Sequence, residues 1–175
     1  MPLASGLVNQ TYPISNTRRA FMASVEKTIE VDVPVETAYN QWTQFETFPQ
    51  FMESVEQVTQ VTDTQLHWVA KVAGKTKEWD AQITEQEPDR RIAWSSTSGA
   101  QNAGVVSFES AGPDRARINL RLEVEPEGPV ESSGAALGFL DRRVQGDLER
   151  FKQFIEERGT STGAWRGEVQ EESAH

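Results

Sequence analysis

The chain has 175 residues, a formal net charge of −10 at pH 7 and no cysteine. This length suits one domain with a hydrophobic core, and the absence of cysteine excludes disulfides, thiolate metal sites and cysteine nucleophiles. The negative charge argues against nucleic-acid and anionic-membrane partners, and no apolar run approaches the ~20 residues of a membrane span. No signal-peptide core is visible near the start. We therefore expect a cytoplasmic protein without a nucleic-acid partner.

The N-terminal part of the sequence predicts a flexible arm, one strand and two short helices. Residues 1–22 show neither helical nor strand periodicity, which is typical of a flexible arm. From Val25 to Val33 every second residue belongs to one face, which predicts a half-buried strand. Pro34 then ends the strand, and the apolar spacing of Val35–Trp42 predicts a short amphipathic helix. We expect Pro49 to begin a second short helical turn.

The middle of the chain reads as a succession of strands joined by short turns. About six segments with a period of two residues follow between residues 55 and 126. The clearest is RARINLRLEVEP, in which apolar residues alternate with charged and polar ones. One buried face and one solvated face are typical of an antiparallel sheet, since parallel strands read as continuous apolar runs.

A long helix is expected from about Val130 to Arg158. Six apolar residues fall within an arc of about 80° on a helical wheel; they are Leu137, Leu140, Val144, Leu148, Phe151 and Ile155. We therefore predict an α+β domain in which a curved seven-stranded antiparallel sheet wraps around this helix. Residues 159–175 are mostly polar and acidic, which predicts a flexible tail, although Trp165 is expected to dock on the domain in some states.

The order of these elements resembles a known family. The stretch VDVPVETAYNQWTQFETFPQFMESVEQV is similar to the opening of the polyketide cyclase/dehydrase and lipid-transport family, which has the START-like, SRPBCC or helix-grip fold. The segments GVVSFES, ARINLRLEVEP and GDLERFKQFIEE agree with its second half. The resemblance covers residues 23–158, which we interpret as the domain. It implies an elongated apolar cavity between sheet and long helix, as in coenzyme Q-binding and cyclase-like proteins, but it does not imply one activity.

Direct signs of catalysis are few. The only histidines are His67 and His175, so neither a histidine metal site nor a nucleophile–histidine triad can be assembled, and we nominate no catalytic residue, metal or cofactor. Asp141 with Lys77 or Ser96 is the only acid–base set that the pattern offers. Each has an alternative interpretation: Lys77 lies near a strand end and reaches water, and Asp141 pairs with a nearby arginine.

Aromatic residues are more informative than charged ones. Trp68, Trp79 and Trp94 share the inward face of the predicted sheet, where they either fill the core or line a pocket for an apolar ligand. Both interpretations stay open. The candidate ligand-binding residues are Trp42, Phe48, Phe51, Trp68, Trp79, Trp94, Phe108, Leu120, Leu140, Asp141 and Val144.

Three functional hypotheses follow. The first is a protein that binds a hydrophobic small molecule, such as a lipid, a quinone or a polyketide-like compound, between sheet and helix. The second is an aromatase/cyclase that closes and dehydrates rings of a poly-β-ketone. The third is a regulatory or assembly protein that binds a protein partner through the apolar cleft. Phe139 lies away from the apolar stripe and marks either packing under the preceding loop or a contact in a possible homodimer.

Overall fold

The computed structural model describes residues 23–72, 74–125 and 134–170, so the predicted N-terminal arm and the last residues of the tail lie outside the described part. The described elements are β1 (Ala23–Val31), α3 (Val35–Trp42), the 3-10 helix η1 (Phe45–Gln50), β2 (Val55–Gln60), β3 (Gln65–Val72), β4 (Lys75–Glu87), β5 (Arg91–Gly99), β6 (Asn102–Gly112), β7 (Arg115–Val124) and α4 (Gly134–Arg158). No helix in these ranges is long and apolar enough to cross a membrane.

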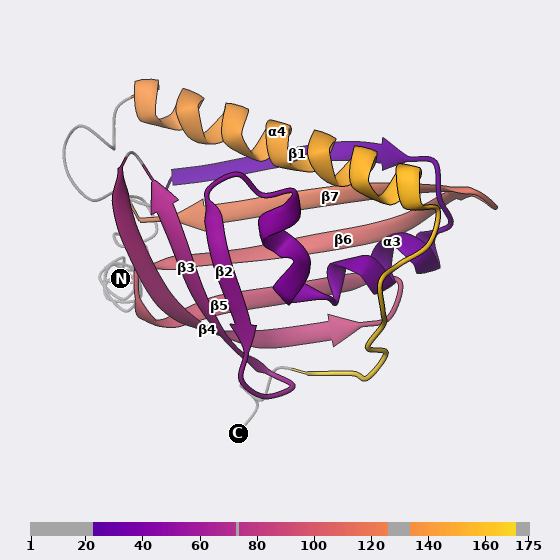
Figure 1. The fold of residues 1–175 in the computed structure, drawn as a ribbon, viewed down its shortest axis with the longest axis horizontal. Coiled ribbons are helices and arrows are strands. Elements are labelled where there is room, and N and C mark those ends of the chain that lie inside the picture. The colour runs from indigo at the N-terminus through magenta and orange to yellow at the C-terminus, as the bar shows by residue number, and fades with distance from the viewer. Residues whose placement is uncertain (1–22, 73, 126–133, 171–175) are drawn as a thin grey trace, which may run out of the picture.

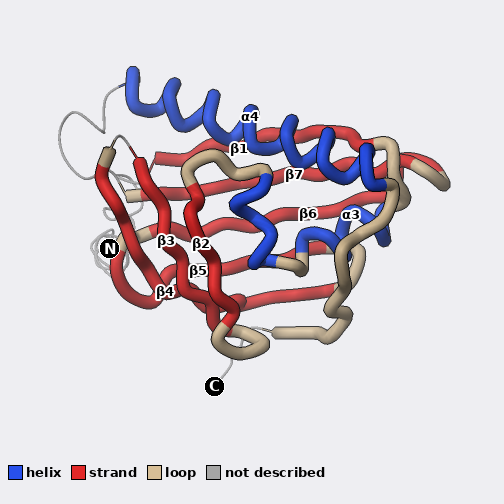
Figure 2. The backbone as a smooth tube through the Cα atoms, in the orientation of Figure 1, coloured by secondary structure: helices blue, strands red, loops and turns tan. Residues whose placement is uncertain are grey.

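The strands form one antiparallel sheet in the order β1-β7-β6-β5-β4-β3-β2. Every neighbouring pair is antiparallel, and β1 and β7 are paired over their whole lengths, from Ala23 with Val124 to Val31 with Ala116. The sheet curves, and α4 runs lengthwise along β1 and β7 (Figures 1 and 2). The predicted α+β helix-grip architecture is therefore confirmed.

The apolar stripe of α4 explains why this helix is held against the sheet. Val144, Leu148, Phe151 and Ile155 are at most 3% exposed, whereas Phe139 on another side of the helix is 43% exposed. Burying a side chain of this size stabilises the fold by roughly 1.5–3 kcal/mol, so the stripe is a principal attachment of the helix. Leu140, near the start of the helix, is only partly buried against the same core.

One local prediction is wrong. The second helical turn begins at Phe45, and Pro49 lies inside it instead of starting it. In this short 3-10 helix the bonds Thr47 N–H to Gln44 and Phe51 N–H to Phe48 do not need an N–H at position 49. Proline is tolerated in such a turn for that reason.

The segment after α4 lies against the domain. A β-bridge joins Val169 to Gln86 of β4, and the backbone N–H of Trp165 donates to Thr43 Oγ1. Figure 1 shows this segment in yellow, running from the end of α4 past α3 towards the end of β4. Of these residues we expected only Trp165 to dock on the domain, and the rest of the segment, which is polar and rich in glycine, was predicted as a flexible tail.

Candidate ligand-binding cavity

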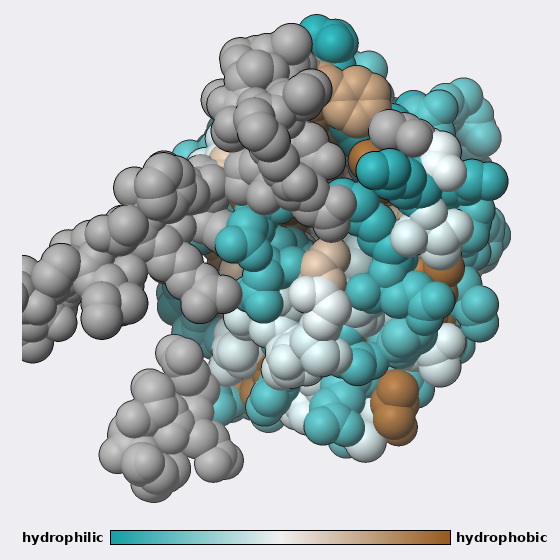
Figure 3. Space-filling view, turned by 90° about the vertical axis from the view of Figure 1, so that its left-hand side faces the viewer, coloured by the Kyte–Doolittle hydropathy of each residue, from teal (hydrophilic) through white to brown (hydrophobic). Residues whose placement is uncertain are grey.

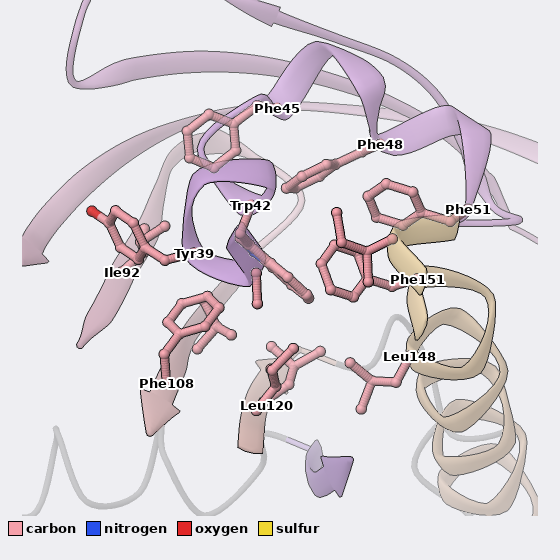
Figure 4. Packing of buried hydrophobic residues seen from close by; sticks show 14 of the residues in the cluster. Tyr39, Trp42, Phe45, Phe48, Phe51, Ile92, Phe108, Leu120, Leu148 and Phe151 are labelled. Atoms are coloured by element: carbon pink, nitrogen blue, oxygen red, sulfur yellow. The ribbon is translucent and has the colours of Figure 1, made fainter. Parts of the chain in front are cut away.

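Aromatic side chains pack closely against one another at one end of the space between sheet and α4. Trp42 lies 4.9 Å from Phe151 and 5.8 Å from Phe48, measured between ring centroids, and Phe51 lies 5.1 Å from Phe151. Tyr39 and Phe108 form a further edge-to-face pair. These rings come from α3, η1, β6 and α4 and converge on one cluster (Figure 4). Edge-to-face rings pack densely, so this end is a solid core.

The other end holds a cavity of about 570 Å³ between the first half of α4 and the concave face of the sheet. Its lining includes Ala23, Val72, Ala100, Val124 and Phe139, which come from the ends of strands, the β5–β6 turn and the start of α4. All of these lie at the same end of the molecule (Figure 1). Figure 3 looks onto this end, where apolar side chains appear among polar ones. A volume of this size matches that of pockets for small organic ligands.

Three tryptophans form the sheet-side wall of the cavity. Trp68 and Trp79 are cross-strand partners on β3 and β4, and their rings stack at 5.7 Å with an interplanar angle of 10°. Trp94 on β5 lies over Gly104 of β6, where a Cβ atom would come within 2.4 Å of the indole. Gly104 therefore lets the Trp94 ring lie close to the sheet, which leaves the space in front of it open.

Charged groups line the cavity from both α4 and the sheet. Asp147 on α4 lines the cavity, and its Oδ1 accepts hydrogen bonds from the Glu53 backbone N–H (3.2 Å) and from Arg150. Burial raises the pKa of the Asp147 carboxyl above its usual value, and the hydrogen bonds from Glu53 and Arg150 offset only part of that effect. Arg143 and Lys77 also line the cavity. The α4 side of the cavity therefore offers a carboxyl group whose pKa is raised by burial.

Most of the predicted binding residues do meet at this cavity. Eight of the eleven line it: Trp42, Phe48, Trp68, Trp79, Trp94, Leu120, Leu140 and Val144. Phe51 and Phe108 do not, because they belong to the filled aromatic core, where they are 1% and 6% exposed. Their spacing correctly indicated an inward direction, but spacing carries no information about which end of the sheet a second layer of helices covers.

Asp141 is a clear departure from prediction. It is not among the lining residues, and its Oδ2 lies 2.9 Å from Lys27 Nζ on β1, so its partner is a lysine where we expected an arginine. Ser96 is also occupied, because its Oγ accepts from the Asn102 N–H at 3.1 Å. Of the nominated acid–base set only Lys77 lines the cavity, so the structure does not bring that set together.

Sequence reasoning missed Asp147. A usable signal existed, because Asp147 follows Leu140 by seven residues and lies about 20° from it around the helix axis. A carboxylate on the edge of an apolar stripe is a candidate for a buried polar contact.

Phe139, proposed as a possible subunit contact, lies at the cavity mouth with the Arg143 guanidinium 4.8 Å from its ring centre. The homodimer stays a prediction.

His67 lies on the outer face of the sheet, opposite to Trp68. Its Nδ1 is 2.7 Å from Asp80 Oδ1 and its Nε2 is 3.0 Å from Glu78 Oε1. These contacts raise the pKa of His67, with the Asp80 hydrogen bond as the main cause. Within the described ranges no three His, Asp or Glu side chains converge on a possible metal position.

The fold and the cavity define a START-like, helix-grip protein. Among solved structures, a START superfamily protein from Mycobacterium smegmatis is similar with a TM-score of 0.63 at 21% identity, covering 77% of this chain and 95% of that one. The Zhui aromatase/cyclase of Streptomyces sp. R1128 is similar with a TM-score of 0.68 at 17% identity, covering 82% of this chain and 99% of that one. At these identities the likeness concerns the fold alone.

The family follows from the sequence itself. Residues 31–153 match the model of the polyketide cyclase / dehydrase and lipid transport family, and the chain belongs to this family. A relative in Streptomyces lincolnensis, described as an uncharacterized 17.2 kDa protein, is 56% identical over 149 residues, which are 85% of this chain and 99% of the relative. The predicted resemblance is therefore confirmed.

Proposed function

We propose that the protein binds a hydrophobic small molecule in the cavity between α4 and the sheet. The observation that carries this proposal is the cavity of about 570 Å³, walled by Trp68, Trp79 and Trp94, in a domain whose other end is densely filled. An empty space of that size loses packing contacts along its walls, so a fold that retains it sacrifices stability. A ligand of suitable shape would restore those contacts.

The chemistry of the walls favours a largely apolar ligand that also carries hydrogen-bonding groups. The stacked indoles of Trp68 and Trp79 give the cavity an aromatic wall, while Asp147 and Arg143 on α4 and Lys77 on β4 supply charged groups. The indole nitrogens of Trp68 and Trp79 and the hydroxyl of Ser54 are buried and have no hydrogen-bond partner. A small movement of these side chains would let a ligand oxygen accept from them and remove the cost of the unpaired donors.

Two measurements test this proposal. Native mass spectrometry of freshly purified protein, followed by solvent extraction, should show a co-purifying apolar compound. Isothermal titration calorimetry with 1-anilinonaphthalene-8-sulfonate should show binding that Leu140→Trp weakens at least about tenfold, because the larger ring occupies the cavity. Val61→Trp is the matched control, since Val61 is 61% exposed and does not line the cavity. A compound-free protein that also fails to bind the probe would sink the proposal.

A second candidate is ring closure and dehydration of a poly-β-ketone in the same cavity. The observation that favours it is Asp147, a carboxyl group whose raised pKa suits a proton donor and which lines the cavity. In the dehydration step Asp147 would protonate the hydroxyl that leaves as water, while the adjacent carbon loses a proton to bulk water and the C=C double bond forms. Turnover of a synthetic poly-β-ketone thioester by the wild type should be lost in Asp147→Asn and retained in Asp141→Asn, which removes a carboxylate outside the cavity. Equal turnover in all three proteins would remove this candidate.

A further inference from the structure

Residues 159–170, here called the latch, form hydrogen bonds with two buried polar side chains, Gln41 and Thr43. Gln41 of α3 is 0% exposed, and its side-chain amide contacts Thr162 twice: Oε1 accepts from the backbone N–H at 2.8 Å and Nε2 donates to Oγ1 at 3.1 Å. Thr43 is 2% exposed and accepts from the Trp165 N–H at 3.1 Å. Such paired contacts to the backbone hold the latch at a defined register on the C-terminal end of α3.

A second group of contacts fixes the far part of the latch. Arg166 donates to Asn40 Oδ1 at 2.6 Å and to Asp89 Oδ2 at 2.9 Å, and its guanidinium lies 5.6 Å from the centre of the Tyr39 ring. Asp89 has φ 64° in the β4–β5 turn, so the turn itself sets the position of this carboxylate. Val169 then pairs with Gln86 through two backbone hydrogen bonds of 2.8 and 2.9 Å.

Docking of the latch also has a free-energy cost, because it covers buried polar groups. Beneath it lie buried polar groups that are incompletely satisfied: Asp89 Oδ1 has no hydrogen-bond partner, and the Tyr39 hydroxyl and the Gln86 side-chain amide have only each other. The hydroxyl of Tyr39 points away from the aromatic cluster (Figure 4), and burial raises its pKa. Unpaired buried polar groups cost free energy that hydration would recover. Lifting the latch would expose these atoms to water, so its closed position is opposed by a cost built into the fold.

The same helix carries one wall of the cavity. Trp42 lines the cavity, and its neighbours in sequence, Gln41 and Thr43, both hold the latch. Gln41 and Trp42 are adjacent residues of a helix of only eight residues. A displacement of the backbone at Gln41 therefore also displaces Trp42. Contacts on its outer side therefore act on the position of the indole at the inner side.

We propose that the latch is a conformational device that holds α3, and with it the Trp42 wall, in the ligand-binding position. Docking of the latch and binding in the cavity are then coupled, and each strengthens the other by the same factor. This inference rests on the proposed function for its ligand, whereas the effect of the latch on α3 stands independently of any ligand. Release of residues 159–170 loosens the wall and lowers the affinity of the cavity.

The test uses two proline variants of the full chain. Thr162→Pro removes the N–H and the hydroxyl that Gln41 contacts, and Ala164→Pro is the matched control, because no hydrogen bond of Ala164 is found among the described residues. Hydrogen exchange should become faster in residues 159–170 and in α3 for Thr162→Pro but not for the control. Affinity for 1-anilinonaphthalene-8-sulfonate should fall at least about threefold in the same variant only.

Further measurements keep the proposal falsifiable. Arg166→Ala, which leaves every Gln41 contact in place, should give the same two effects more weakly. Saturating the wild type with the probe should slow exchange in the latch. Faster exchange in the latch with unchanged exchange in α3 would overturn the proposal. A wild type that fails to bind the probe would count against the proposed function alone, since α3 exchange in Thr162→Pro still decides whether the latch holds the helix.

Discussion

The two ends of the space between α4 and the sheet are built from the same kinds of residue, but one end is densely packed and the other holds a cavity. At the filled end Phe51, Phe108 and Phe151 are 0–6% exposed and pack against neighbouring rings, and Trp42 lies at the border between this end and the cavity. At the open end Trp79 and Trp94 are only partly buried and face a cavity. Aromatic content therefore does not decide whether a region of this fold is core or pocket.

The presence or absence of a second layer of helices over the sheet decides whether a region is core or cavity. The filled end has a second layer, because α3 and η1 insert Tyr39, Trp42 and Phe48 between the sheet and the second half of α4. The open end has the N-terminal part of α4 above it, with Phe45, Phe48 and Met52 at its border, and α4 presents Leu140 and Asp147 to it. The cavity is the volume that a second layer would have occupied.

Truncation of one ring at the filled end should have the largest effect on stability. Phe151→Ala should lower the free energy of unfolding by about 3–5 kcal/mol, because Phe151 is 0% exposed and contacts both Trp42 and Phe51. Urea unfolding followed by circular dichroism measures this. Phe139→Ala, at the cavity mouth, should cost less than about 1 kcal/mol. Equal losses in the two variants would mean that the two ends do not differ in packing.

Closing the open end from the sheet side should have an intermediate effect. In Gly104→Ala the new methyl group would come within 2.4 Å of the Trp94 ring, which has to move into the cavity. We expect a loss of about 1–3 kcal/mol of stability from overpacking. Affinity for 1-anilinonaphthalene-8-sulfonate should fall at the same time. A variant that is destabilised but binds the probe as the wild type does would show that Trp94 moved elsewhere.

The order of elements could be predicted because it rests on periodicity. The alternation of β7 and the stripe of α4 each determine one buried face, and the structure confirms both, with Ile118 and Leu148 nearly inaccessible. Direction towards the core was therefore predictable for ten of the eleven candidate residues, and eight of these line the cavity. Periodicity fails where a residue's role depends on a distant partner.

Asp141 and Asp147 show this limit most clearly. Both lie near an edge of the α4 stripe, and their sequence environments do not distinguish them. Asp141 meets Lys27 on β1, and Asp147 meets the Glu53 backbone next to the cavity. Which edge faces the cavity depends on how α4 is rotated over the sheet. Apart from the expected docking of Trp165, the latch contacts were not predicted for a related reason, since Gln41 and Thr43 contact residues more than a hundred positions away.

The carboxyl group at the open end should give a pH-dependent effect that the filled end lacks. The folded-state pKa of Asp147 is raised above its ordinary value of 3.8, mainly by burial. Its contribution to stability is therefore fully present below that ordinary value and is lost as the pH rises through the folded-state pKa. Asp147→Asn should be more stable than the wild type at pH 7, and the difference should vanish towards pH 3. Urea unfolding at both pH values measures this, and a pH-independent difference would contradict it.

The smallest expected effect is that of Gly138→Ala, which tests whether the cavity at the open end is preformed. Gly138 lies in the first half of α4, and a Cβ there would meet only the Arg142 guanidinium at an ordinary 3.5 Å. Gly138→Ala should therefore stabilise the helix by about 0.5–1 kcal/mol without filling the cavity. If the cavity is preformed, stiffening the helix above it leaves the affinity for 1-anilinonaphthalene-8-sulfonate unchanged, since the bound and free shapes are the same. If ligand entry requires this half of α4 to bend, the variant binds the probe more slowly while its stability rises. Stopped-flow fluorescence separates the two cases, and we expect unchanged association, because the missing second layer already leaves the space open.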